Sequence, residues 1–242
     1  MAVPAPRQLS LPEEFVLLSH LPSGKVHGTA RAAIGCAAAE VGELALRRKL
    51  LLRTRKFRKL GFDIYRTHGV EIELLDTGPT GLAWADESLS ELRRRCSASG
   101  NGRCKLLPWL RHRHGAFSLH RDALAGRGAL IPTSGGIAGL FGAKQRHHPH
   151  PELHGALVAE LRAAGAEHAR IDEHMLFLRD IVETVRLGKE LGVPASMRDR
   201  LDRARGIGGV ELVPEELRDT SAALISLVPS HDNDTRYRRP RV

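Results

Sequence analysis

Residues 29–45 place the strongest limit on the fold, because their apolar side chains recur with a helical period and most of them are small. Ile34, Ala38, Val41 and Ala45 are separated by four, three and four positions, which is the repeat of one face of an α-helix. Glycine, alanine and cysteine fill much of the rest of the stretch. Since small side chains let neighbouring elements approach a helix closely, we expect a central helix with Thr29 as its N-cap.

The remaining patterns favour a mainly helical chain. Aromatic residues make up only 4% of the 242 residues, so leucine, alanine, valine and isoleucine must build the core, and this mix favours helices over sheets. Apolar periodicity and capping signals predict helices at 11–18, near 89–92, around Trp109, and at 118–125, 151–164, 171–185 and 196–205. Residues 50–52 and 70–74 are expected to pair as one β-hairpin. Residues 129–132 and 137–141 are expected to form a second, unusually apolar one.

The domain organisation follows from length and composition. A chain of 242 residues suits one substantial domain. No Pro/Gly-rich linker divides it, so we expect a helical domain over residues 10–229. Residues 1–9 are interpreted as a flexible N-terminus, and residues 230–242 as a disordered basic tail.

The charge of the chain indicates polyanionic partners. Lysine and arginine number 37 against 28 acidic residues, for a formal net charge of +9 and a pI near 10.1. A field of this sign attracts nucleic acid, anionic lipid headgroups or phosphorylated small molecules, although heavy arginine usage also follows from a GC-rich genome. No stretch approaches the ~20 apolar residues of a membrane span, and the N-terminus lacks a secretion signal. We expect a cytoplasmic protein whose contact with a membrane is peripheral.

Motifs for catalysis, cofactors and metals are weak. There is no Gly-x-Ser-x-Gly, no phosphate loop and no dinucleotide fingerprint, so the chain is interpreted as non-catalytic and without a cofactor. Histidines cluster at positions 147, 148, 150 and 154, but Pro149 and Pro151 hold this segment extended. Cys96 and Cys104, with His112 and His114, depart from the usual short metal-ligand spacing. We expect no metal site at either place.

One basic run has the composition of a contact with a membrane surface. It consists of Arg53, Arg55, Lys56, Phe57, Arg58 and Lys59. Each cation near an anionic bilayer contributes about 1 kcal/mol, and a buried phenylalanine adds to that. A solvated hairpin tip is the alternative interpretation of this run. Residues 196–205 alternate arginine with aspartate, so salt-bridged exposure to solvent is expected there.

Several blocks of the sequence resemble the Golgi phosphoprotein family. Residues 11–14 (Leu-Pro-Glu-Glu) resemble the family's opening, and residues 43–50 resemble its stretch Glu-Leu-Ala-Leu-Arg-Gly-(Arg/Lys)-Leu. Residues 76–81 and 86–89 resemble its Pro-Thr-Gly-Asp and Asp-Glu-Ala-Leu block. Further matches in the same order fall at 109–110, 128–130, 140–141 and 148–149. The resemblance covers residues 10 to about 190 and is weak beyond 195.

The resemblance implies a fold and a membrane role. The fold implied is a central helical bundle ringed by amphipathic helices, with one or two short β-hairpins. The apolar hairpin, which the family uses for membrane insertion and self-association, would map onto Leu130, Ile131, Ile137, Leu140 and Phe141. Eukaryotic members retain glycosyltransferases and bind phosphatidylinositol 4-phosphate, so anionic phospholipid or phosphoinositide headgroups, client proteins and a second copy of the chain are the implied partners.

The family's lipid ligands are not matched residue by residue. Gly28 stands where the family has its tryptophan, and Ala37 where it has its first arginine. The other two arginines fall near His114 and Phe117, where Arg111, Arg113 or Arg121 could substitute. Arg48 and Leu82 also replace a usual glycine and a usual aspartate.

The implied function is therefore that of a non-catalytic peripheral membrane protein that binds anionic headgroups and acts as an adaptor. Two alternatives remain at this point. One is a winged-helix-like nucleic-acid module, disfavoured because the hairpin tip at 133–136 lacks arginine and lysine. The other is a protein–protein adaptor that binds no lipid.

Overall fold

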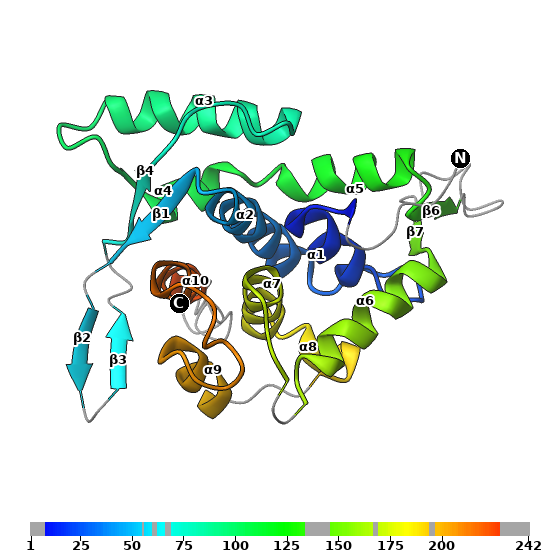
Figure 1. Cartoon of the computed structure of the whole chain (residues 1–242). Coiled ribbons are helices and arrows are strands. Elements are labelled where there is room, and N and C mark those ends of the chain that lie inside the picture. Colours follow the sequence, from blue (N-terminus) through cyan, green and yellow to red (C-terminus); the bar gives the residue numbers. More distant parts are fainter. Residues whose placement is uncertain are drawn as a thin grey trace, which may run out of the picture.

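The computed structural model describes residues 8–54, 56–59, 62–65, 69–133, 146–166, 169–193 and 197–227. Within these ranges the chain forms ten helices and seven short strands (Figure 1). The helices are α1 (Leu11–Ser19), α2 (Thr29–Leu46), α3 (Ala83–Ser97), α4 (Leu106–His112), α5 (Ala116–Gly126), α6 (Pro151–Ala163), α7 (Glu173–Thr184), α8 (Gly188–Leu191), α9 (Met197–Ala204) and α10 (Glu215–Leu227). The strands are β1 (Leu50–Arg53), β2 (Lys56–Lys59), β3 (Phe62–Tyr65), β4 (Glu71–Leu74), β5 (Cys104–Lys105), β6 (Leu130–Thr133) and β7 (Arg146–Pro149). The prediction of a mainly helical fold with short hairpins is confirmed.

Helix α2 lies at the centre of the bundle, as its small-residue face predicts. It contacts α1, α4, α5, α7 and α10, which surround it in Figure 1. A Cβ atom added at Gly35 would lie 2.4 Å from the Phe15 ring, and one added at Gly42 would lie 2.7 Å from Leu11 Cδ2. These two glycines therefore let α1 pack directly against the backbone of α2.

The first residue of α1 agrees with the prediction, and that of α2 differs from it by one position. Helix α1 begins after Ser10, whose backbone N–H donates to the Glu13 carboxylate at 2.8 Å, as the capping-box pattern predicts. Helix α2 begins one residue earlier than expected, since its N-cap is Gly28 and not Thr29. Gly28 adopts a left-handed conformation with φ of 49°, a geometry that glycine accepts without steric cost.

The hairpin predicted from residues 50–52 and 70–74 is confirmed. Strand β1 pairs antiparallel with β4, with Leu50 opposite Leu74 and Leu52 opposite Ile72. A third strand that the sequence did not reveal, β5, pairs with the other edge of β4. The chain between β1 and β4 forms a separate two-stranded hairpin of β2 and β3.

The second predicted hairpin has a different partner strand. Strand β6 pairs antiparallel with β7, with Leu130 opposite Pro149 and Thr133 opposite Arg146. The return strand expected at 137–141 lies outside the described residues. The histidine-rich segment is therefore a strand of the hairpin, consistent with the extended conformation that its prolines favour.

The last helix was not predicted. Helix α10 buries Leu217 and Leu224, and its Thr220 hydroxyl accepts a hydrogen bond from the Leu52 backbone N–H at 3.3 Å. One hydrophobic cluster extends through the described residues from Leu9 to Leu224. Helix α10 thus belongs to the same core as α1 and α2.

Candidate functional site

Arg113, one of the three arginines proposed to bind a headgroup, is held by a buried carboxylate. Glu40 on α2 is 1% exposed and accepts two hydrogen bonds of 2.7 Å from Arg113 and one of 3.0 Å from His120. Burial would raise the pKa of Glu40, but the hydrogen bonds of His120 and Arg113 outweigh it and lower that pKa. The Arg113 guanidinium therefore neutralises a core acid, and its assignment as a lipid ligand stays a prediction.

The other two arginines of this set lie at the surface. Arg111 in α4 is exposed and makes no ion pair with the described residues. Arg121 in α5 pairs with the neighbouring Asp122 at 2.8 Å. Arg121 also lies close to β7, because its charge adds to burial in lowering the pKa of His147. Arg111 and Arg121 remain available to an anionic ligand.

The basic run is divided between two hairpins. Arg53 ends β1 and forms an ion pair with Glu73 of β4, and Arg103 binds the same carboxylate at 2.9 Å. Hydrogen bonding by Arg53 is the main reason that the pKa of Glu73 is lowered. Arg55 lies outside the described residues. Residues 56–59 form β2, where Phe57 is in register with Ile64 of β3.

The residues assigned to the apolar hairpin have different environments. Leu130 is fully buried in the core, and its role in insertion or oligomerisation stays a prediction. Ile131, the next residue, is 44% exposed, as expected from the alternation of a strand. Ile137, Leu140 and Phe141 lie outside the described residues.

Helix α9 corrects the expectation of simple solvent exposure. Arg203 is 2% exposed and contacts Asp180 at 2.8 Å and Glu183 at 2.9 Å, both on α7. Asp180 also accepts the Ser221 hydroxyl hydrogen bond from α10 at 2.8 Å. Glu183 is also bound by Arg179 at 2.8 Å. This buried ionic cluster joins α7, α9 and α10, and the alternating charge of α9 alone did not show which arginine points inward.

The described residues contain no group of three or more side chains placed to hold a metal ion. One of the histidines near the β6–β7 hairpin, His20, has a structural role in the core. It is 1% exposed, stacks on Phe117 with ring centroids 5.5 Å apart, and donates from Nδ1 to the Val16 carbonyl oxygen at 2.8 Å. Burial is the main reason that its pKa falls to about 4. His20 is therefore a neutral member of the core.

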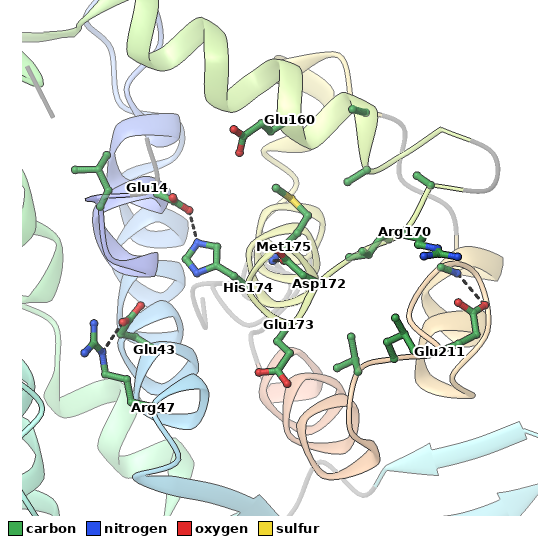
Figure 2. Close-up of a pocket in the computed structure, with 18 residues that line it drawn as sticks. Glu14, Glu43, Arg47, Glu160, Arg170, Asp172, Glu173, His174, Met175 and Glu211 are labelled. Carbon is green, nitrogen blue, oxygen red and sulfur yellow. Dashed lines mark hydrogen bonds and ion pairs between the residues drawn. The ribbon is translucent and has the colours of Figure 1, made fainter. Parts of the chain in front are cut away.

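One large cavity in the described part of the chain is acidic, although the chain as a whole is basic. It has a volume of about 1140 Å³ and lies between α1, α2, α6, α7 and the segment before α10 (Figure 2). Its charged and titratable lining residues are Glu14, Glu43, Glu160, Asp172, Glu173, Glu211, Arg47, Arg170 and His174. Six carboxylates therefore face two arginines and one histidine. Met175, Leu9 and Leu212 supply apolar surface, and Leu212 is 85% exposed.

A buried acid and a half-buried histidine form a pair in this cavity. His174 Nε2 is 2.6 Å from a carboxylate oxygen of Glu14, whose side chain is 5% exposed (Figure 2). Burial raises the pKa of Glu14, and repulsion from Glu160 and Glu43 adds to this effect. Burial would lower the pKa of His174, but the Glu14 hydrogen bond and charge outweigh it and raise that pKa. Both shifts favour the state in which the pair holds a proton, so the cavity partly neutralises its own charge.

Two of the sequence blocks that carry the family resemblance contact each other in space. Arg47, at the end of α2, donates to the Thr80 carbonyl oxygen at 3.0 Å. The Thr80 N–H and hydroxyl both donate to Asp86 at 2.7 Å. Lys49 forms an ion pair with Asp76 in the same loop. These contacts hold the turn before α3 against the end of α2. Both sequence blocks therefore have a structural role.

Comparison with known proteins supports the family resemblance that these blocks indicate. The family model described as Golgi phosphoprotein 3 (GPP34) matches residues 11–224. This span includes α10 and therefore extends beyond the residues in which the resemblance is visible by motif. Comparison with curated proteins finds no match. Among the helices of the described residues, none combines the length and the apolar character that a membrane span requires. The chain belongs to the Golgi phosphoprotein 3 (GPP34) family.

Proposed function

We propose that this protein is a non-catalytic peripheral membrane protein that binds anionic lipid headgroups through the end of the molecule formed by α5 and the β6–β7 hairpin. The observation that carries the proposal is the combination of exposed apolar and cationic side chains on these contacting elements. Ile131 on β6 is 44% exposed and Leu119 on α5 is 43% exposed. Isolated exposed apolar residues are common, so the charge around them matters.

The same elements also carry cations. Arg146 begins β7, is exposed, and has no ion-pair partner among the described residues. Within the described residues, the ion-pair partner of Arg121 on α5 is the neighbouring Asp122. Interfacial binding of proteins combines apolar side chains that enter the acyl boundary with cations that bind anionic headgroups. The net charge of +9 adds long-range attraction to the same surface.

The segment that joins β6 to β7 extends this apolar character in sequence. It contains the Ile137, Leu140 and Phe141 proposed for insertion or self-association. The last pair of residues between β6 and β7 is Thr133 and Arg146, and this segment connects these two residues in sequence. A phosphatidylinositol 4-phosphate-like headgroup remains part of the proposal through family membership, without an assigned pocket.

Liposome co-sedimentation tests the proposal. We expect the protein to pellet with vesicles that contain phosphatidylserine or a phosphoinositide, and much less with pure phosphatidylcholine. Removal of both cations in Arg121→Gln/Arg146→Gln should weaken binding by about 2 kcal/mol, or roughly 30-fold. Arg93→Gln on α3, which also removes an exposed arginine, is the matched control. Arg113 is unsuitable for this test, because its replacement would leave the buried carboxylate of Glu40 without its arginine partner.

Two results would contradict the proposal. Equal pelleting with neutral and anionic vesicles would exclude recognition of anionic headgroups. The nucleic-acid alternative would be favoured if the protein does not bind vesicles but shifts nucleic acid in a gel, with an affinity that falls steeply as the salt concentration rises. We propose recruitment of client proteins as the second part of the function, because family membership supports an adaptor role. A pull-down that survives high salt in a protein that does not bind vesicles would favour an adaptor that binds no lipid.

A further inference from the structure

The acidic cavity differs in sign from the rest of the molecule. Six carboxylates line it in a chain of net charge +9. Several of them already have partners: Glu43 binds Arg47 at 2.7 Å, and Glu173 binds Arg48 at 3.1 Å. Glu160 is exposed at the cavity edge and makes no ion pair with the described residues. The cavity therefore retains unneutralised negative charge beside apolar side chains.

We propose that residues 228–242 of the same chain dock in this cavity, with the arginines at 236, 238, 239 and 241 facing its carboxylates. The docking is independent of lipid binding. The segment carries four arginines within six positions and also contains Tyr237 and Pro240. Arginine side chains bind carboxylates bidentately, and Tyr237 and Pro240 offer apolar surface to Leu212 and Met175.

The length of the chain allows this contact. Val213 lines the cavity and α10 begins two residues later. The 13 residues of α10 carry the chain about 20 Å away at 1.5 Å per residue. The eight residues 228–235 can span up to about 26 Å at ~3.3 Å per residue. Arg236 can therefore return to the cavity.

Covalent attachment favours this segment over a free basic peptide. A segment on a short connection is present near its site at an effective concentration in the millimolar range. Even a weak interaction of several arginines with carboxylates then fills the cavity much of the time. Glu160 lies on α6 and Glu211 in the segment before α10 (Figure 2), so an arginine-rich segment can contact two separate elements.

Hydrogen exchange of the full chain, read by mass spectrometry at low salt, tests the proposal. The variant Arg236→Gln/Arg238→Gln/Arg239→Gln/Arg241→Gln should exchange about twofold faster or more at residues 169–175 and 209–213 than the wild type. Glu160→Gln should reproduce part of this effect from the other side of the contact. Glu152→Gln is the matched control, because Glu152 is also exposed on α6 but does not line the cavity.

Three outcomes would overturn the proposal. Unchanged exchange at the cavity in the four-arginine variant means that the segment does not dock there. If the four-arginine variant exchanges faster at the cavity but Glu160→Gln does not, the segment docks elsewhere. Protection that grows with protein concentration assigns the contact to a second copy of the chain. A synthetic peptide of residues 234–242 that restores protection to the four-arginine variant would support the proposal.

Discussion

Replacement of Arg203 by methionine should destabilise the fold strongly. The Arg203 guanidinium is 2% exposed and contacts Asp180 through Nε at 3.1 Å and Nη2 at 2.8 Å, and Glu183 through Nη2 at 2.9 Å. Methionine keeps much of the apolar stem and removes the charge. Among the described residues, Asp180 then keeps the Ser221 hydroxyl and Glu183 keeps Arg179 as a hydrogen-bond partner, and both carboxylates remain buried. Loss of one member of a buried ion pair costs about 3–5 kcal/mol.

This cost should be measurable by thermal and urea unfolding followed by far-UV circular dichroism. For a domain of this size, each kcal/mol shifts Tm by roughly 2–4 °C, so a decrease of about 6–20 °C is expected. Arg200→Met is the control, because Arg200 lies on the same helix, is half-buried, and has no ion-pair partner among the described residues. It should change the free energy of unfolding by only about 0.5 kcal/mol.

The cause of the effect can be separated from a loss of packing. If the stranded carboxylates are responsible, Asp180→Asn should restore part of the stability in the Arg203→Met background. Burial is already the main cause of the raised pKa of Glu183. Without Arg203 the folded state should bind protons more tightly than the unfolded state, so the deficit should shrink as the pH falls towards the ordinary carboxyl range. An Arg203→Met loss no larger than that of Arg200→Met would refute the reasoning.

Two further predictions concern the core. As the pH falls from 6.5 to about 4, the unfolded state protonates His20 before the folded state does, so roughly 3 kcal/mol of stability should be lost, and His20→Leu should remove this part of the pH dependence in urea titrations. An identical pH slope in His20→Leu would contradict the burial of a neutral imidazole. Gly35→Ala should cost about 1–3 kcal/mol, because the added Cβ would lie 2.4 Å from the Phe15 ring. The same substitution at Gly155, a helical position with nothing within 4 Å, should stabilise the protein by about 0.5–1 kcal/mol. A Gly35→Ala protein as stable as the wild type would show that the Phe15 ring does not pack against the α2 backbone at Gly35.

Local features of the sequence predicted much of the fold because they depend on neighbouring residues alone. The period of small residues in α2 required close packing on that helix. The alternation in residues 70–74 indicated a strand, and its pairing with β1 was confirmed. The Ser10–Glu13 pattern marked the beginning of α1. Pro149 and Pro151 indicated an extended segment but did not reveal that it is strand β7.

The functional surface was less predictable, because the availability of a charge depends on distant residues. Arg111 and Arg113 are two positions apart in a basic stretch, yet one is exposed and the other is held by Glu40, 73 positions away. Arg203 is buried by acids on α7, although its own helix has the composition of a solvated one. Sequence spacing carries no information about such partners.

The sequence alone determined that this chain is a basic, mainly helical member of its family, because period, composition and motif are properties of consecutive residues. Tertiary structure decided which cations are free, placed α10 in the core, and assembled an acidic cavity from α1, α2, α6, α7 and the segment before α10. The physical reason is that burial and charge pairing arise between segments that are distant in sequence, and these interactions decide which side chains remain available to a partner.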